Sequence, residues 1–429
     1  MDRSLLAVLA GTFTLRFSTG LTGAMLGFYL ASLAADGHPV DAVVVGIFSA
    51  TFYAAELVLS PFFGILSDRI GHHRVMLYGP VFGGVAVIMT GLTTNLVILG
   101  GTRWLEGAST AASVPSILGY IAMVTANDEA LRGRAAARFE GATLAGLGVG
   151  FAVAPLLFEL LGANAFFLNA VIYGGSFLIY WRGVEDPAGE RDTLTAPHFG
   201  WRRYANLLST SHVWLLAPTW IAVNASIGLW FSQSIFQFAR ADPRFPDQAL
   251  MRGFSALEIT IGAVVIGLLF GAGLLYWGER FKNLRRTTII LYGILGGGAL
   301  VAAGLVINHG AGLGLPITLA AAGTAGFGLF VLAGATPAAL GLLADISERF
   351  PADRGAIMGL YSVFLGLGQI AGSLIGGFAA SWRGVDGLLV ATMALLLLAL
   401  LPLAQLRRHE HYVGGPGAPA VLDGGDLEA

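Results

Sequence analysis

The chain has 429 residues, of which 55% are hydrophobic and only 12% are charged. Soluble domains usually carry about 25% charged residues, so this composition excludes an ordinary soluble domain. The formal net charge of −2 gives no reason to expect a nucleic-acid partner, and the absence of cysteine excludes a disulfide framework and a thiolate site.

Long apolar segments recur along the whole chain. Most have about the 20 residues that an α-helix needs to cross a bilayer, and only a helix satisfies the backbone of an isolated segment in lipid. The alternation typical of membrane barrel strands is absent. The sequence therefore predicts an all-α membrane protein with twelve transmembrane helices, at about residues 4–34, 41–66, 74–96, 98–125, 135–162, 164–181, 212–238, 255–278, 287–308, 312–345, 355–381 and 385–406.

The basic residues predict the orientation of these helices. Of the 24 lysines and arginines, 18 fall on the same side as the N-terminus and four on the opposite side. Cytoplasmic loops are enriched in basic residues, so we expect both termini in the cytoplasm of a multi-pass protein of the inner (plasma) membrane. The first apolar segment lacks a small-residue cleavage site, so no cleavable signal peptide is expected.

The longest connection without apolar character follows the sixth segment. It divides the chain into two six-helix halves. The predicted parts are an N-terminal half at 1–183, a cytoplasmic linker at 184–211, a C-terminal half at 212–408 and a flexible cytoplasmic tail at 409–429.

The two halves have related sequences. Leu77-Tyr78-Gly79 in the first half corresponds to Leu291-Tyr292-Gly293 in the second, and Arg132-Gly133 corresponds to Arg354-Gly355. Because these pairs occur in the same order and at similar offsets, we infer an internal duplication. Repeated halves with a substrate site between them are typical of secondary transporters.

A charged, glycine-rich turn separates the second and third apolar segments. It runs from Gly64 to Arg74 and holds Asp68-Arg69, Gly71 and the pair His72-His73. Such a turn cannot lie in hydrocarbon, so it marks a membrane surface. Its pattern resembles the signature of the loop between helices 2 and 3 of major facilitator superfamily transporters.

The resemblance extends over about residues 4–406 and includes bacterial members that exchange drugs or other small molecules for protons. It implies alternating access, in which two halves rock around a site at the membrane midplane. It also implies that the Asp68 carboxylate contacts the N-terminus of helix 11, which begins near Arg354.

A second stretch, Arg103-Trp104-Leu105-Glu106-Gly107, resembles the family's helix 4 motif, which is linked to proton coupling. Glu106 stands where the motif has glutamine. The added carboxylate either makes the site responsive to protons or neutralises Arg103, and the sequence leaves both open.

Charged residues inside the apolar segments are candidates for function, because each costs about 3 kcal/mol or more in the bilayer. Arg16 lies about 18 Å into the first helix, near the midplane. Glu56 lies within the second. We predict proton coupling by Glu56 and Glu106, with Arg16 and Arg103 as charge partners or substrate anchors. The alternative for Arg16 and Glu56 is a buried pair that holds two helices together.

Three uncharged polar residues complete the predicted substrate site. Tyr53 shares a helix face with Glu56, and Asn224 and Gln369 lie within the seventh and eleventh segments. Aromatic rings with neutral amides suit an amphipathic organic molecule.

We also predict a gate at the cytoplasmic face. Its members come from the charged turn and from the ends of helices 5 and 11: Gly64, Asp68, Arg69, Gly71, Asp128, Arg138, Glu140 and Arg354.

Together these features predict a secondary transporter that exports an amphipathic small organic molecule in exchange for protons. The alternatives are a proton symporter or facilitator that imports an organic anion, or a lipid transporter on the same scaffold. The sequence has no P-loop, so ATP is not the expected energy source. We expect a monomer in the lipid bilayer with no enzymatic activity, no cofactor and no metal site.

Overall fold

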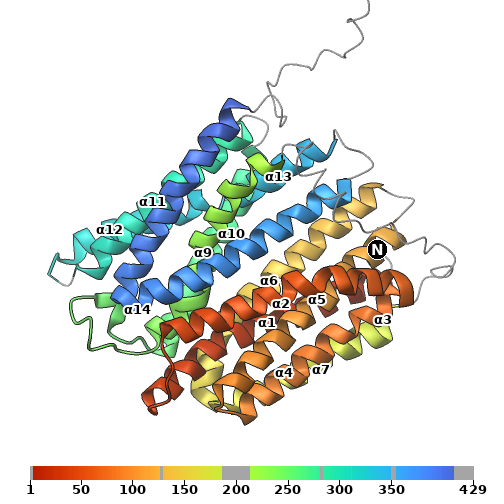
Figure 1. Cartoon of the computed structure of the whole chain (residues 1–429), viewed down its shortest axis with the longest axis horizontal. Helices are drawn as coiled ribbons and strands as arrows, with labels where there is room; N and C mark the ends of the chain where they lie inside the picture. Colours follow the sequence, from red (N-terminus) through yellow and green to blue (C-terminus); the bar gives the residue numbers. More distant parts are fainter. Residues whose placement is uncertain are drawn as a thin grey trace, which may run out of the picture.

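The computed structural model describes residues 3–125, 129–185, 213–280, 284–310, 312–348 and 354–409. Within these residues every long element is an α-helix, and the isolated β-bridge between Ala241 and Arg252 is the one strand-like pairing. The helices run side by side in one elongated bundle (Figure 1).

The N-terminal half contributes seven helices in the described residues. They are α1 (Arg3–Ala35), α2 (Ala42–Ile70), α3 (His72–Met76), α4 (Tyr78–Leu92), α5 (Leu96–Val124), α6 (Glu129–Leu161) and α7 (Asn164–Gly183). The predicted third transmembrane helix is broken at Leu77 into the short α3 and the longer α4. Gly71, at φ 104°, separates α3 from α2 because few other residues adopt that conformation.

The C-terminal half begins with the 3₁₀ turn η1 (Val213–Leu215). A second turn, η2 (Ala249–Met251), lies in the loop after α9. The helices are α9 (Ala217–Phe238), α10 (Ala256–Glu279), α11 (Arg286–Asn308), α12 (Leu315–Leu332), α13 (Ala335–Glu348) and α14 (Arg354–Arg408). The last of these bends at Arg383–Gly384, where the backbone leaves helical geometry.

The described helices are consistent with the predicted twelve membrane passes. Nine segments of the described chain are long and apolar enough to span a bilayer, and one of these, Gly359–Arg408, covers 50 residues and both arms of α14. The shorter α7 and α9 account for the remaining two passes. α3 with α4, and α12 with α13, each form one pass. Most of the predicted linker and all but one residue of the predicted tail lie outside the described residues.

Twelve passes bring Arg3 and Arg408 to the same end of the bundle, which we call the amino-terminal face. The opposite end, the distal face, carries the connections at 36–41, 93–95, 162–163, 239–255 and 309–314 and the bend in α14. Side chains that point outward between these faces are apolar. On α10, for example, they are Leu257, Ile261, Val265, Leu268 and Leu275.

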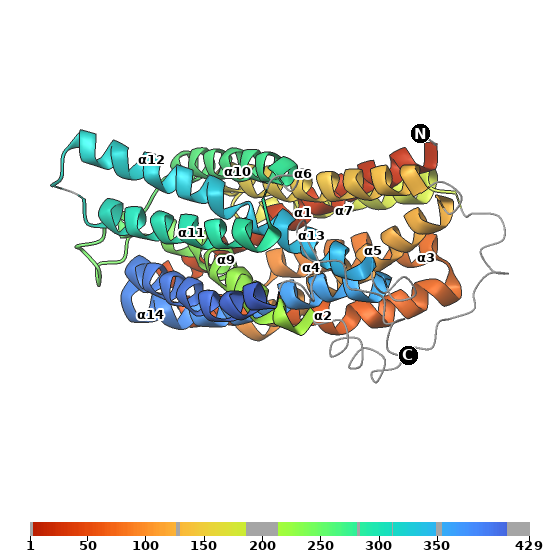
Figure 2. The same cartoon turned by 90° about the horizontal axis from the view of Figure 1, so that it is seen from above.

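The two halves lie next to each other in both views (Figures 1 and 2). They meet where α2 contacts α14, where α6 contacts α10 and where α1 contacts α9. Near the distal face the α2–α14 contact is very close, because Gly46 faces the Ser373 carbonyl and Gly377 faces the Ala42 carbonyl, with no side chain between them.

Glycines also let α1 and α6 approach each other within the N-terminal half. Gly20 of α1 lies against the Leu147 carbonyl, and Gly146 of α6 lies against the Phe13 carbonyl and Cβ of Arg16. Small residues at such seams allow helix backbones to pack closely in membranes. The seam therefore places α6 directly beside Arg16.

We expect Gly150→Ala to destabilise the protein, because a Cβ there would collide with the Phe17 carbonyl oxygen. Overpacking of this kind costs about 1–3 kcal/mol. The matched control is Gly148→Ala on the same helix, where a Cβ would meet nothing within 4 Å. The thermal midpoint of purified protein in detergent should fall for the first variant and hold or rise for the second. Equal shifts of the thermal midpoint in the two variants would contradict the close packing of α1 against α6 at Gly150.

Candidate functional site

Arg16 of α1 lies at the centre of a group of charged side chains. It is buried, and its Nη1 donates a hydrogen bond to Thr110 Oγ1 of α5 at 3.4 Å. It interacts electrostatically with Glu56 of α2 and with Glu140 of α6. Among the described contacts no direct ion pair ties Arg16 to either carboxylate, so one guanidinium is shared between two of them.

The two carboxylates differ in their surroundings. Glu56 is half-buried, whereas Glu140 is exposed although it lies well within α6. Glu140 also interacts electrostatically with Tyr361 of α14, across the boundary between the halves. Glu140 therefore interacts with the central group around Arg16, and its predicted role in the gate stays a prediction.

Arg103 and Glu106 form a separate ion pair within α5, as their spacing on one helix face predicts. Both are almost completely buried, at 4% and 2% exposed. Arg103 Nε and Glu106 Oε1 have no hydrogen-bond partner among the described residues. Of the two roles that the sequence left open for Glu106, this geometry favours neutralisation of Arg103.

The C-terminal half faces the central group with aromatic and amide side chains. Trp220 of α9 stacks on Tyr361 of α14, with ring centroids 5.4 Å apart. Asn224 donates to the Trp220 carbonyl of its own helix at 2.9 Å. Gln369 is buried near Gly228, and its Oε1 has no hydrogen-bond partner in the described structure.

Tyr53 lies one turn before Glu56 on α2. It is half-buried and stacks edge-to-face on Phe52, with centroids 5.1 Å apart. It also interacts electrostatically with Glu56. Tyr53 and Glu56 therefore form one polar stripe, as the sequence predicts.

The charged turn lies at the amino-terminal face. Asp68 is 41% exposed with its Oδ1 3.8 Å from His72 Nε2, and Arg69 is exposed. The Gly71 N–H donates to the Ser67 carbonyl at 3.1 Å, and His73 Nε2 lies 3.0 Å from the Tyr180 carbonyl of α7. These contacts hold the turn against its own half.

Other members of the predicted gate are only partly described. Gly64 lies beside Pro115 of α5, and Arg138 is exposed on α6. Asp128 and the side chain of Arg354 lie outside the described structure. The contact between Asp68 and the start of α14 therefore stays a prediction.

A hydrogen bond joins the halves near the distal face. Gln233 Nε2 of α9 donates to the Ala42 carbonyl of α2 at 2.9 Å, and Gln237 Nε2 donates to Gln233 Oε1 at 3.3 Å. Gln233 is fully buried. With the close glycine contacts between α2 and α14, this bond holds the distal side of the bundle closed.

The loop between α9 and α10 adds charges at the same place. Asp242 is buried and accepts hydrogen bonds from Arg244 Nε and Nη2 at 3.0 and 2.7 Å, and its Oδ2 lies 3.3 Å from Arg240 Nη2. The hydrogen bonds from Arg244 hold the pKa of Asp242 below its usual range. Both arginines interact electrostatically with Asp41, the N-cap of α2 in the other half.

Sequence reasoning missed this distal group. Gln233 and Gln237 have the spacing of one helix turn, which is a weak signal inside an apolar helix. Nothing in the sequence pairs Asp41 with a loop about 200 residues further on. The three-dimensional packing of the halves brings them together.

Long apolar helices around a charged centre define a multi-pass membrane transporter. The chain belongs to the Major Facilitator Superfamily, whose family model matches residues 8–333. The quinolone resistance protein NorA of Staphylococcus aureus (strain MSSA476) is 23% identical over 308 residues, which cover 69% of this chain and 71% of that protein. The human chromaffin granule amine transporter is 32% identical over 124 residues, which cover 29% of this chain and 23% of that one.

Solved structures share the fold at low identity. The nucleoside transporter NupG superposes with a TM-score of 0.70 at 12% identity. The superposition covers 95% of this chain and 99% of the NupG chain. The human organic anion transporter MFSD10 (TETRAN) gives a TM-score of 0.62 at 18% identity, over 94% and 99% of the two chains. These similarities establish the architecture and carry no information on the substrate.

The buried pair in α5 can be tested by comparing the loss of one charge with the loss of both. Glu106→Gln leaves the Arg103 guanidinium as an uncompensated buried charge and should cost about 3–5 kcal/mol of stability. The joint replacement Arg103→Met with Glu106→Leu should cost less, because no charge remains. Unfolding in detergent measures both, with the exposed Glu159→Gln of α6 as control. A double variant as unstable as the single one would contradict a structural pair.

The low pKa of Asp242 predicts a pH dependence. Its contribution to stability is fully present above the pKa of an unfolded aspartate, about 3.9, and is lost as the pH falls through the lower folded value. Asp242→Asn should lower the thermal midpoint at neutral pH and flatten its decline in acid. Asp36→Asn, an exposed residue on the same face, should leave the wild-type curve unchanged. If the thermal midpoint of Asp242→Asn fell in acid as steeply as that of the wild type, Asp242 would not be the source of this pH dependence.

Proposed function

We propose that this chain exports an amphipathic organic molecule in exchange for protons, by alternating access of its two halves around the central group. The observation that carries this proposal is the shared guanidinium of Arg16. Two carboxylates, Glu56 and Glu140, interact electrostatically with one guanidinium, while Arg103 is neutralised by Glu106. When all five are ionised, these side chains carry one excess negative charge.

An excess negative charge favours a cation over an anion. Import of an organic anion held by both Arg16 and Arg103 is disfavoured, because the Arg103 guanidinium is already paired with Glu106. The charge balance therefore supports a substrate or a proton that brings positive charge.

The surrounding walls suit an amphipathic molecule. The rings of Tyr53, Trp220 and Tyr361 offer apolar surface and faces that attract cations. The buried Trp220 Nε1 and Gln369 Oε1 lack protein partners among the described residues and are free to bind a polar group. The similarity to NorA, a quinolone resistance protein, agrees with a substrate of this kind.

Competition between a proton and an organic cation for the same negative charge would couple the movement of one to the movement of the other. A proton on Glu56 or Glu140 removes the excess negative charge, and a bound organic cation balances it. The site then holds one or the other but not both, which is the requirement for exchange. We assign coupling to these two carboxylates and a supporting role to the Arg103–Glu106 pair.

The proposed orientation follows the basic residues. The amino-terminal face carries most of the arginines, which supports a cytoplasmic position for it and for both termini in the plasma membrane. With this orientation, alternating access assigns the closed distal side to the state that collects substrate from the cytoplasm for export.

Proton flux in proteoliposomes tests the proposal. Purified protein with an internal pH-sensitive dye should move protons when a lipophilic organic cation is added, in the direction opposite to the cation. Glu56→Gln and Glu140→Gln should each reduce this flux about tenfold or more, equivalent to about 1.4 kcal/mol or more. The control Glu159→Gln removes an exposed carboxylate of the same helix as Glu140 and should keep full flux.

Two results would contradict the proposal. Movement of protons in the same direction as an organic anion would establish symport. Substrate transport without proton movement, with both glutamine variants fully active, would establish a facilitator and leave the carboxylates with a structural role.

A further inference from the structure

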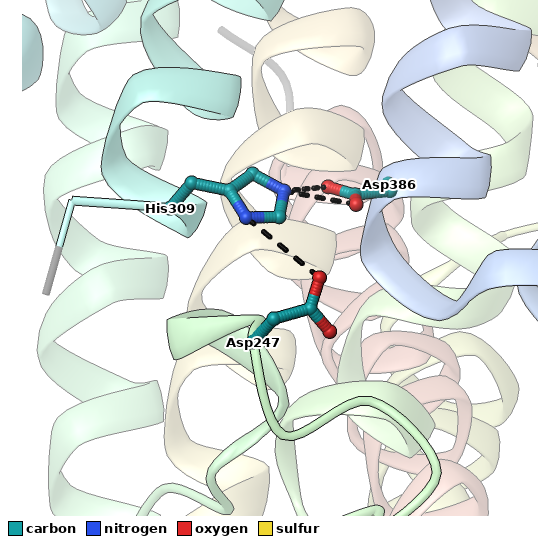
Figure 3. Close-up of side chains that lie close together, drawn as sticks. All are labelled: Asp247, His309 and Asp386. Atoms are coloured by element: carbon teal, nitrogen blue, oxygen red, sulfur yellow. Dashed lines mark hydrogen bonds and ion pairs between the residues drawn. The ribbon is translucent and has the colours of Figure 1, made fainter.

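A cluster of ionisable side chains lies at the distal face, away from the central group. Asp247 comes from the loop between α9 and α10, His309 from the end of α11, and Asp386 from α14 just after its bend (Figure 3). His309 Nε2 lies 2.9 Å from both oxygens of Asp386, and Nδ1 lies 4.0 Å from Asp247 Oδ2. The imidazole is therefore held between two carboxylates.

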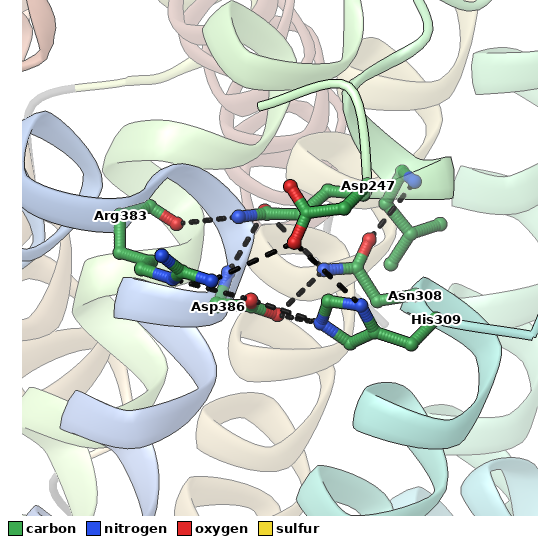
Figure 4. A network of polar contacts seen from close by, with 7 residues as sticks. Asp247, Asn308, His309, Arg383 and Asp386 are labelled. Carbon is green, nitrogen blue, oxygen red and sulfur yellow. Dashed lines mark hydrogen bonds and ion pairs between the residues drawn. The ribbon is translucent and has the colours of Figure 1, made fainter. Parts of the chain in front are cut away.

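Neutral and cationic groups surround this cluster (Figure 4). Asp386 is only 7% exposed and accepts a hydrogen bond from Asn308 Nδ2 at 2.8 Å, while its own N–H donates to Gln248 Oε1 at 3.1 Å. Leu250 N–H in turn donates to Asn308 Oδ1 at 2.9 Å. The loop is thus tied to both α11 and α14.

Arg383 supplies the remaining charge. Its guanidinium lies 3.5 Å from Asp247 and 3.8 Å from Asp386. With two carboxylates and one arginine, the cluster has one excess negative charge when His309 is neutral and is balanced when His309 is protonated. Charge-assisted hydrogen bonds are roughly twice as strong as neutral ones, so protonation strengthens the contact to Asp386.

The same three side chains are of the types that bind metal ions, and their ligand atoms lie within 4.8 Å of one another. The arrangement favours a proton instead. Both nitrogens of His309 face carboxylates, the 2.9 Å contact with both Asp386 oxygens fits an N–H donor, and Arg383 already lies beside both acids.

The opposite end of the loop faces the N-terminal half. There Arg240 and Arg244 interact electrostatically with Asp41 at the start of α2. Gln233 donates a hydrogen bond to the carbonyl of the next residue, Ala42. The loop therefore links the distal cluster to the boundary that must separate when the bundle opens on this side.

We propose that Asp247, His309 and Asp386 form a proton-dependent clasp on the distal face. With His309 protonated, the clasp holds the loop on α11 and α14 and stabilises the closed distal side. With His309 neutral, the loop loses its ion pair between His309 and Asp247 and keeps the neutral hydrogen bonds of Gln248 and Leu250, so it is held less firmly and distal opening becomes easier. The pH on the distal side thereby biases the conformational equilibrium independently of the central carboxylates.

The absence of cysteine makes a direct test possible, since one introduced thiol is the only one in the full-length protein. A spin label at Pro246→Cys, an exposed position next to Asp247, reports the mobility of this end of the loop in lipid nanodiscs with EDTA present. Across about pH 5 to 8, where histidines change charge, the ratio of immobile to mobile label should fall roughly threefold, as expected for losing the exposed ion pair between His309 and Asp247.

Three variants give the proposal its controls. His309→Gln should leave the loop mobile at every pH, and His309→Arg, which keeps a positive charge, should leave it ordered at every pH. His38→Gln alters an exposed histidine on the same face outside the cluster and should retain the wild-type response.

Several outcomes would overturn the clasp. The wild-type loop could keep one mobility across the range, or His38→Gln could abolish the response. His309→Arg could titrate like the wild type. Ordering that develops only when Zn²⁺ is added, and that EDTA reverses, would establish a metal site in place of the clasp. None of these readouts depends on the transported molecule or on proton flux.

Discussion

A guanidinium near the middle of the membrane is the constraint on which the central site depends. Arg16 cannot stay uncompensated in that environment, and its compensation comes from three other helices, through Thr110, Glu56 and Glu140. Glu140 comes into range because Gly146 lets α6 pack against the backbone of α1 beside Arg16. The close packing of α1 against α6 is therefore also what brings Glu140 near Arg16.

The two halves contribute different chemistry to that centre. Charges belong to the N-terminal half, whereas stacked rings and amides, including Trp220, Tyr361 and Gln369, belong to the C-terminal half. Glu140 and Tyr361 interact across the boundary. A rocking motion that separates the halves changes the surroundings of Glu140 without any change within α6, so the movement itself alters how readily the carboxylate carries its charge.

The sequence predicts the helices well because lipid leaves a long apolar segment few alternatives. It does not predict the breaks at Leu77 and between α12 and α13, since these interrupt apolar runs without a change in composition. Arg103 and Glu106 meet as their spacing predicts, because both lie on one helix. The electrostatic interaction of Glu140 with Arg16 was not predicted, because it depends on how α1 and α6 pack.

The distal cluster could not be predicted for a related reason. Asp247, His309 and Asp386 come from three segments, each more than 60 residues from the next. Each alone resembles an ordinary loop or helix-end residue. Only the fold shows that a buried carboxylate, Asp386, needs partners from two other segments.

The bend in α14 links these parts mechanically. Only Arg383 and Gly384 leave helical geometry between its two arms, and Asp386 lies two residues beyond them. The first arm contacts α2 and α9 at the boundary between the halves, and the second packs against α11. A connection of two residues leaves little freedom between the two arms. A tilt of the first arm therefore also displaces Asp386, so movement at the boundary between the halves is coupled to the polar cluster at the bend.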